Sequence, residues 1–423
     1  MSAARRTAIV YPLAALVLLA LLFAWQRGAY PNYAEGVYLF SARLILDGAL
    51  PYRDFIAAHP PLLFYAGAAI LAVWDSIDGA RLLLSLVNLA TGGLVATAVL
   101  RLTGNWIAAV IGGVAALIAP WSLHEHAMLM PETFGALVLM GAALLAARAR
   151  TAVWAGLLAA GAVGFKWPFL LCGLALAVVT PARFRFLAAL AGGFAGGVLV
   201  SFAVFGADRL YEQLVVAQQD VGWHTLRIVA GYTVQAAWNL LPLLVPAAFA
   251  VLLGRRARDR ALLRTLIAFA AAALVLVATI TKTGTYLNAI ALAEPPLVAL
   301  ASAGVVWLMR APRPRWAPAA IVAALALGVA QVGAFLAAPD EPGFFLRPFS
   351  AHGHAWVSEE ETGRAVAAAR ACPAGVPYSG HPYMAFVARR RMPGDEPDQF
   401  LMVKTPVGAP ALAEASAEPE RCP

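Results

Sequence analysis

Charged residues are scarce in this sequence. Asp, Glu, Lys and Arg make up 13% of its 423 residues, whereas an average soluble domain carries about 25%. Hydrophobic residues make up 61%, so most of the helices cannot face water. The composition excludes an ordinary soluble globular protein and indicates a polytopic membrane protein.

The apolar segments also lack the alternation of apolar and polar residues that a transmembrane β-barrel needs. Runs of about 17 to 25 apolar residues, the length that crosses roughly 30 Å of hydrocarbon, recur as far as about Ala338. Such runs form helices in lipid, because a helix satisfies its own backbone hydrogen bonds. The first run, Ala8 to Trp25, follows two arginines as a signal peptide would, but it is long and no small-residue cleavage site follows, so we interpret it as an uncleaved span.

The hydropathy pattern predicts eleven spans. They cover residues 8–25, 81–100, 105–122, 132–147, 151–165, 168–181, 186–205, 236–253, 265–281, 288–309 and 316–338. The apolar run from Pro60 to Trp74 is left out because its length of about fifteen residues is too short to cross the bilayer. With that run at the membrane surface, one side of the membrane collects the arginine-rich short loops, at Arg5, Arg6, Arg101, Arg148, Arg150, Arg183, Arg185, Arg255, Arg256, Arg258, Arg260, Arg264, Arg310, Arg313 and Arg315. The positive-inside rule makes this side cytoplasmic, together with the N-terminus, and places the C-terminus outside.

Cysteine is nearly absent too. Cys172 lies in an apolar run and is expected in the core, whereas Cys372 and Cys422 follow the last span and could pair in an oxidising compartment. Residues 1–338 are thus predicted to form the membrane domain, and residues 339–423 a small external α/β domain. Its expected parts are helices at "SEEETGRAVAAARAC" and "HPYMAFVARRRM", a short strand at "GVPYSG", and a disordered end at "GAPALAEASAEPERCP".

The sequence has no Gly-rich nucleotide-binding loop and no convincing internal repeat. Its formal net charge is +8, but arginines in cytoplasmic loops explain this excess, so no nucleic-acid partner is expected. No nucleotide sugar is expected to bind.

The first external loop, residues 27–80, is long and studded with polar residues. If Tyr33 to Asp47 is helical, Tyr33, Val37, Phe40 and Leu44 form one apolar stripe, and Glu35 lies nearly opposite. Such a helix would rest on the membrane surface with Glu35 turned towards water or a cavity. Asp47 and Gly48 supply a helix stop, and "HPPLLFY" begins a second interfacial helix.

At this point the sequence resembles the membrane-embedded GT-C glycosyltransferases. The nearest group is the family 39-like set, which includes protein O-mannosyltransferases, the aminoarabinose transferases of lipid A and lipopolysaccharide-core transferases. The matching features are the early acidic residue, the helix ending in "DG", "LPYRDF", "PPLLFY", "RLLLSLVNLATGGLVATAVLRL", "GAVGFKWPF", "KTGTYLNAIALAEPP" and "YSGHPYMAFVARRRMP". The resemblance covers nearly the whole chain and says more about the fold than about the substrate.

The resemblance implies a catalytic base in the first external loop, usually within an Asp-Glu pair. Here the pair is Ala34-Glu35, so Glu35 inherits the role, although Asn32 and Glu35 also fit a helix capping box. Asp54 is a second candidate, for the acceptor pocket or merely for a solvated loop. Glu132 matches the acid that the family usually has in the second external loop, but behind Pro131 it also fits a helix-dipole role.

The resemblance also implies a cation at the donor phosphate. Lys166 and Lys282 are the first candidates, although a lysine near a helix end often snorkels without a function. Arg227 and His224 are further candidates for the same pocket. His124 and His126 are weak candidates for a divalent metal ion, because their i, i+2 spacing puts them on different faces of a helix.

The function implied is transfer of a sugar from a polyprenyl-phosphate donor to a glycan, lipid or protein acceptor on the outer face of the bacterial cytoplasmic membrane. In this scheme Glu35 takes the acceptor's proton and the lysines stabilise the departing lipid phosphate. Two alternatives stay open: a secondary transporter or lipid flippase, and a non-catalytic protein that binds polyprenyl phosphate. Membrane lipids are partners in every case.

Overall fold

Helices make up all the regular structure in the part of the chain that can be described. The computed structural model describes residues 2–26, 32–119, 121–122, 128–283, 287–310, 316–337, 359–373, 375–418 and 422. Each predicted span corresponds to one helix: α1 (Ala3–Gln26), α4 (Ile77–Thr103), α5 (Trp106–Ile118), α7 (Pro131–Ala146), α8 (Ala152–Val163), α9 (Leu170–Val179), α10 (Arg183–Phe205), α13 (Leu226–Leu252), α14 (Arg260–Val277), α15 (Ala289–Met309) and α16 (Ala317–Ala337). Among these described helices, α1, α4, α10, α13, α14 and α15 have the length and composition to cross a membrane. α5, α7, α8 and α9 are shorter and apolar, and α16 is apolar over Ala317–Gly333. The predicted all-α polytopic fold is confirmed.

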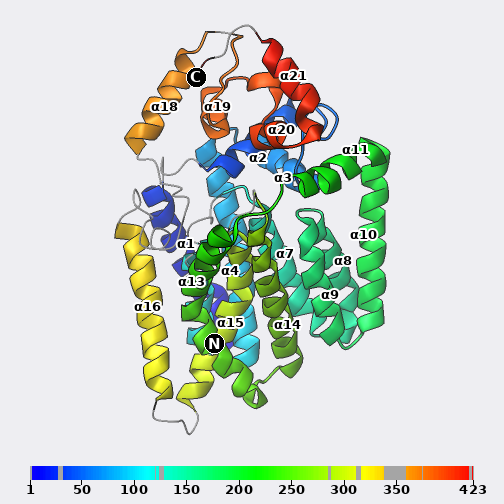
Figure 1. Ribbon diagram of the computed structural model, residues 1–423. Helices are drawn as coiled ribbons and strands as arrows, with labels where there is room; N and C mark the ends of the chain where they lie inside the picture. Colours follow the sequence, from blue (N-terminus) through cyan, green and yellow to red (C-terminus); the bar gives the residue numbers. More distant parts are fainter. Residues whose placement is uncertain are drawn as a thin grey trace.

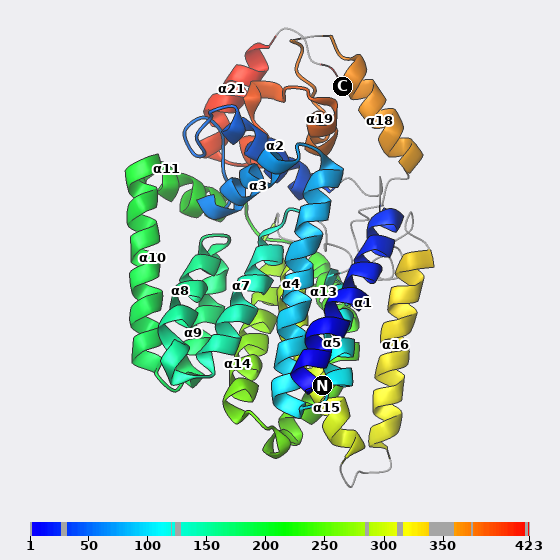
Figure 2. The same cartoon turned by 180° about the vertical axis from the view of Figure 1, so that it is seen from behind.

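The helices stand side by side in a bundle with α15 at its centre (Figures 1 and 2). In the span of α15, 83% of the residues are buried, compared with 6% in α10. A helix that is apolar all round belongs in the interior of such a bundle, whereas α10 stands at the edge and exposes apolar side chains. Cys172 is buried in α9, as predicted.

A proline in α13 creates one of the contacts between helices. Pro242 has no N–H, so the carbonyl of Trp238, four residues earlier, loses its helical donor. Gln331 of α16 donates its side-chain N–H to that carbonyl at 3.0 Å. This bond ties α16 to the bundle, because an unpaired carbonyl in lipid is costly.

The first loop forms two helices at one end of the bundle. α2 (Tyr33–Leu46) begins where Asn32 Oδ1 accepts from the Glu35 N–H at 3.1 Å, and it ends at Asp47 and Gly48 as predicted, with Gly48 at φ 97°. α3 (Pro61–Val73) begins on the turn after α8, where the Leu62 N–H donates to Gly164 O at 3.1 Å. α4 starts at the same end (Figure 2), so the chain from Asn32 to Ser76 does not cross the bundle. This arrangement agrees with leaving residues 60–74 out of the spans.

A second connection covers the same end. It consists of α11 (Ala207–Tyr211), a π-helical turn (Glu212–Val216) and α12 (Ala217–Asp220). The side chain of Gln213 accepts from the Ala57 N–H at 2.9 Å and donates to Tyr52 O at 2.9 Å. The first loop is therefore held by side-chain hydrogen bonds to its backbone.

The C-terminal domain is helical in its described residues. It contains α18 (Glu359–Ala371), α19 (Pro382–Ala388), α20 (Gln399–Lys404) and α21 (Ala409–Ala417), and Cys372 is disulfide-bonded to Cys422 as the sequence allowed. The first two helices were predicted. The strand expected at "GVPYSG" does not form. Tyr378 pairs with Cys422 in an isolated β-bridge that does not extend into a ladder. The end expected to be disordered instead forms α21, whose alanine-rich sequence favours a helix and whose Ala415 is fully buried.

The C-terminal domain packs directly on α2. A Cβ at Gly36 would lie 2.3 Å from the Tyr383 backbone nitrogen, so only glycine permits this close approach of α2 and α19. The Arg43 guanidinium donates to Phe386 O at 2.8 Å and pairs with Asp75 at 2.6 Å. α2 is thus buried on two sides. The prediction that Glu35 faces water or a cavity is wrong, because its side chain is fully buried.

The orientation in the membrane can be tested with reporter fusions. The C-terminal domain and the Arg258 turn lie at opposite ends of the bundle (Figure 1), and the arginine-rich loops predict that the Arg258 end is cytoplasmic. A reporter that is active only outside the cell should give a signal after Pro423 and none at Arg258. The reverse pattern would refute the orientation. If both fusions reported the same side, the odd number of predicted crossings between Arg258 and Pro423 would be refuted.

Candidate functional site

Glu35 forms a buried ion pair with Arg81 in the second turn of α4. Its two carboxylate oxygens accept from Arg81 Nε at 3.1 Å and Nη2 at 2.7 Å. The exposed fractions of the two side chains are 0% for Glu35 and 5% for Arg81. Asn32 is the helix cap, but the Glu35 side chain reaches Arg81 rather than back to Asn32. Acting as a base would require Arg81 to release this carboxylate and water or substrate to reach it.

Lys166 and Glu132 form a second ion pair near the same end of the bundle. Glu132 lies in the first turn of α7 behind Pro131, and Lys166 lies in the turn between α8 and α9. Lys166 Nζ and Glu132 Oε1 are 2.6 Å apart, and Glu132 is 1% exposed. Within the described part of the chain, Glu132 Oε2 has no hydrogen-bond partner. One oxygen of this carboxylate therefore remains available.

Lys282 lies close to this pair. It follows α14, and its ammonium group donates to Gln218 Oε1 at 2.7 Å. The amide nitrogen of Gln218 in turn donates to Ala58 O in the first loop at 3.2 Å. Burial, and next the charge of Lys166, lower the pKa of Lys282. Two cations from different helix ends thus lie within electrostatic reach of one another.

His59 belongs to the same group, although the sequence analysis did not single it out. It lies just before α3, and its Nε2 is 2.7 Å from the Tyr38 hydroxyl of α2. Burial, and then the charges of Lys166 and Lys282, lower the pKa of His59 to about 3. His59 is therefore neutral at physiological pH. We call His59, Glu132, Lys166 and Lys282 the lysine site; it holds two cations and one anion.

Three other predicted residues lie apart from the lysine site or at its edge. Asp54 accepts from Arg53 and from the Leu50 N–H, and these contacts lower its pKa to about 2, so it is a poor base. Arg227 is exposed at the start of α13. The His224 N–H donates to Thr281 O at 2.8 Å, one residue before Lys282, and its ring packs edge-on against Tyr232.

A metal centre is not tested by the described residues. His124 and His126 lie outside them. Across the ranges that the structure describes, no three His, Cys, Asp or Glu side chains are grouped as metal ligands.

Glu294 is an acidic residue that the sequence analysis missed. It is fully buried in α15 and accepts from the Trp121 N–H at 2.8 Å and from the Ser122 N–H and hydroxyl at 2.6 Å each. It thereby holds the start of the segment between α5 and α7. An acid within an otherwise apolar span was the available signal, because such residues are rarely without a role.

A buried carboxyl group, that of Glu396, joins the C-terminal domain to the first loop. Glu396 Oε2 accepts from the Ile56 N–H at 2.7 Å and Oε1 from the Asp398 N–H at 2.9 Å. The Tyr33 hydroxyl accepts from the Phe400 N–H at 3.0 Å. Burial raises the pKa of Glu396 to about 8 and that of Asp398 to about 6. The domain therefore contacts the first loop through the Glu396 carboxyl group and through the Phe400 backbone.

The Glu35–Arg81 pair can be tested as a unit. Glu35→Gln should lower the free energy of unfolding by about 3 to 5 kcal/mol, because it removes the partner of a buried guanidinium. Adding Arg81→Gln should restore most of the loss, since no unpaired charge then remains. Thermal unfolding checks both. Sugar-transfer activity in the stable double variant then decides the role: near wild-type activity indicates a structural pair, whereas a loss of about 10² to 10⁴ would identify Glu35 as the base.

The Glu396 contact should make the C-terminal domain sensitive to pH. Its folded-state pKa is raised to about 8, so the folded domain keeps a proton that the unfolded chain releases above the ordinary pKa. The free energy of unfolding should therefore fall as the pH rises from about 6 to about 8, by up to about 1.4 kcal/mol per pH unit. Urea midpoints from pulse proteolysis measure this. Glu396→Gln should flatten the dependence and the exposed Glu414→Gln should keep it; equal slopes in both variants would contradict the assignment.

Comparison with known structures identifies the architecture. No protein-family model matches the sequence, and no curated protein is significantly similar to it. The crystal structure of ArnT from Cupriavidus metallidurans bound to undecaprenyl phosphate aligns with a TM-score of 0.59 and 15% sequence identity, over 91% of this chain and 85% of that one. ArnT in the apo state aligns with a TM-score of 0.56 and 16% identity, over 90% and 84% of the two chains. The chain therefore shares the polytopic helical fold of ArnT over most of its length.

Proposed function

We propose that the protein is a glycosyltransferase of the bacterial cytoplasmic membrane that uses a polyprenyl-phosphate-linked sugar as its donor. The observation that supports this most directly is the pair of lysines, Lys166 and Lys282, whose charges lie within electrostatic reach of each other in a fold shared with ArnT bound to undecaprenyl phosphate. The acceptor is a glycan, lipid or protein on the side of the membrane where the C-terminal domain lies.

In this proposal the lysine site holds the donor phosphate. An ammonium group on a flexible stem is a compact point charge that suits a phosphate. Both lysines are held by neighbours, Lys166 by Glu132 and Lys282 by Gln218. The lowered pKa of Lys282 means that a bound anion would stabilise its protonated form. The carrier's hydrocarbon tail would lie along the apolar helices of the bundle.

Glu132 meets the needs of the base better than Glu35 in this arrangement. When the donor phosphate replaces Glu132 as the partner of Lys166, the Glu132 carboxylate becomes free next to the reacting carbon. The acceptor oxygen then bonds to the anomeric carbon, its proton passes to Glu132, and the bond from that carbon to the phosphate oxygen breaks. The leaving phosphate takes the electron pair, and Lys166 and Lys282 stabilise its charge. A single displacement of this kind inverts the anomeric centre.

A non-catalytic carrier-binding protein is the second candidate. It is favoured by one observation: the first-loop acid, Glu35, is fully buried and occupied by Arg81, and Ala34 stands where the family usually has an aspartate. In that case the lysine site binds the lipid phosphate but no transfer follows.

The donor site is tested by lysine substitutions. Charge-assisted contacts contribute roughly 1.5 to 3 kcal/mol each, so Lys282→Ala should weaken undecaprenyl phosphate binding at least about tenfold. Lys166 must be replaced together with its partner, as Lys166→Gln with Glu132→Gln, because a lone buried carboxylate would destabilise the fold. The exposed Lys404→Ala is the matched control. Affinity by microscale thermophoresis is the measurement, and unchanged affinity in both site variants would exclude the lysines.

Glu132→Gln alone separates the two candidate functions. It frees Lys166 from its internal counter-ion, so undecaprenyl phosphate should bind more tightly than to wild type. An amide cannot take up a proton, so transfer should fall by about 10²- to 10⁴-fold if Glu132 is the base. Tighter binding with unchanged transfer would move the base elsewhere. No transfer by the wild-type protein with any polyprenyl-phosphate sugar would favour the non-catalytic function.

A further inference from the structure

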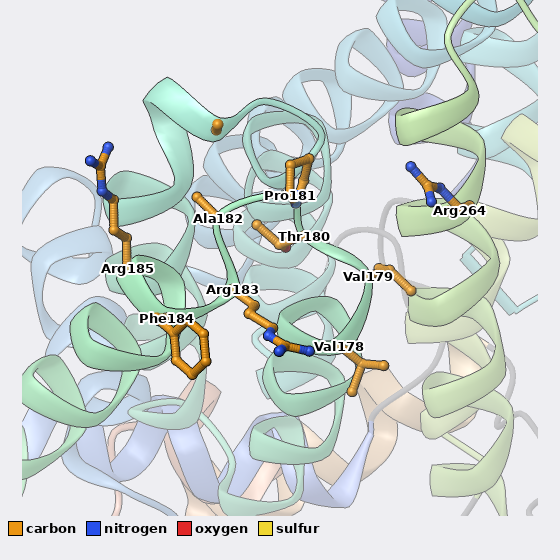
Figure 3. Close-up of a pocket in the computed structure, with 10 residues that line it drawn as sticks. Val178, Val179, Thr180, Pro181, Ala182, Arg183, Phe184, Arg185 and Arg264 are labelled. Atoms are coloured by element: carbon orange, nitrogen blue, oxygen red, sulfur yellow. The ribbon is translucent and has the colours of Figure 1, made fainter.

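A second cationic feature lies at the opposite end of the bundle from the C-terminal domain. The turn from α9 to α10 borders an open cavity of about 810 Å³, whose lining includes Thr180, Pro181, Arg183, Arg185 and Arg264. Figure 3 shows Arg183 and Arg185 on the first turn of α10, and Arg264 pointing from α14 towards the turn. Three arginines from two different helices thus border one hollow, with the Arg185 guanidinium directed away from Arg264. None of these residues belongs to the lysine site.

The positive charge of this hollow is not balanced by acids. Residues 148–151, 178–186 and 260–266 contain no Asp or Glu and six arginines, Arg148, Arg150, Arg183, Arg185, Arg260 and Arg264. The acid next in sequence, Asp259, is already paired with Arg101 at 2.6 Å and caps α14. Within the described ranges, the side chains of Arg183, Arg185 and Arg264 form no ion pair. The positive charge of the hollow is therefore not neutralised by an acidic side chain of the described residues.

The surface beside the hollow is apolar and exposed. Val178 and Phe184 line the cavity and are 78% and 74% exposed. Farther along α10, Leu199 and Val200 are 67% and 64% exposed. In a protein of this fold such a face lies against acyl chains, and the arginines at its end reach the head-group level. One ligand that is anionic at one end and apolar along its length would contact both surfaces.

We propose that this hollow binds the head group of an anionic glycerophospholipid from the leaflet at the arginine-rich end. The guanidinium groups would donate pairs of hydrogen bonds to lipid phosphates, a geometry that arginine provides and lysine does not. Basic pockets between transmembrane helices commonly bind lipids with multiple phosphates. Cardiolipin, with two phosphates in its head group, matches three arginines best, and its acyl chains would lie along α10. The proposal is independent of the transfer chemistry, because it requires only that the bundle spans a membrane.

The test compares two variants with equal loss of charge. The first replaces the hollow's arginines (Arg183→Gln, Arg185→Gln, Arg264→Gln); the control replaces three arginines at the same end but outside it (Arg255→Gln, Arg256→Gln, Arg310→Gln). Native mass spectrometry of the purified protein with added cardiolipin gives the bound fraction. Wild type and control should bind alike, and the hollow variant at least about tenfold more weakly. If the triple variant misfolds, the single Arg264→Gln at an exposed position replaces it. We expect a smaller loss of cardiolipin binding in that variant.

Three results would overturn the proposal. The first is equal cardiolipin binding by the hollow variant and the control, which would indicate attraction by net charge alone. The second is equally tight binding of zwitterionic phosphatidylethanolamine, which would leave the arginines without a role. The third is a preference of the hollow for undecaprenyl phosphate over cardiolipin, which would make it a carrier site.

Discussion

The buried ion pair between Glu35 and Arg81 fixes the first loop to the helical bundle, and the candidate site depends on that attachment. It joins the first turn of α2 to the second turn of α4. α2 then presents Tyr38 to His59, and the segment that follows starts α3 on the α8–α9 turn, beside Lys166. Two fully desolvated charges stabilise the structure only while both are present. The position of the first loop beside the lysines therefore depends on a contact between two residues that lie outside the lysine site.

The C-terminal domain also holds the first loop in place. Its approach to α2 at Gly36 is too close for any side chain, and its Glu396 accepts a hydrogen bond from the backbone of the first loop. These contacts remove α2 from water on the side that the bundle leaves open. A helix that would otherwise lie on a membrane surface is thus held between two layers of protein, which explains how an acid such as Glu35 is buried so close to the end of the bundle.

The positively charged side chains at the two ends of the bundle differ in exposure and in their partners. Near the C-terminal domain, Lys166 and Lys282 are partly buried, and each is held by a polar or charged side chain, because burial of a free cation is costly. At the other end, Arg183, Arg185 and Arg264 are exposed and border an apolar surface. In the two proposals above, the partnered lysines exchange their internal partners for one phosphate ligand, whereas the exposed arginines contact the phosphates of surrounding lipid. The same charge type therefore supports two different kinds of site.

The sequence by itself determined the spans and most helix ends. An apolar run in lipid has one practical backbone conformation, the helix, so hydropathy located the eleven helices of the predicted spans. Local signals marked helix ends, Asn32 and Gly48 at α2 and Pro131 at α7. Composition was less informative in the short tail, where α21 depends on packing of Ala415 and the expected strand has no extended partner. Only the tertiary structure decided which charges meet. Arg81 reaches Glu35 from 46 residues away, and Lys166 reaches Glu132 from 34, so neither pair has a local pattern. Tertiary packing alone places His59 near the charges of the two lysines. Burial and these charges set its protonation state, and no sequence period encodes either of them.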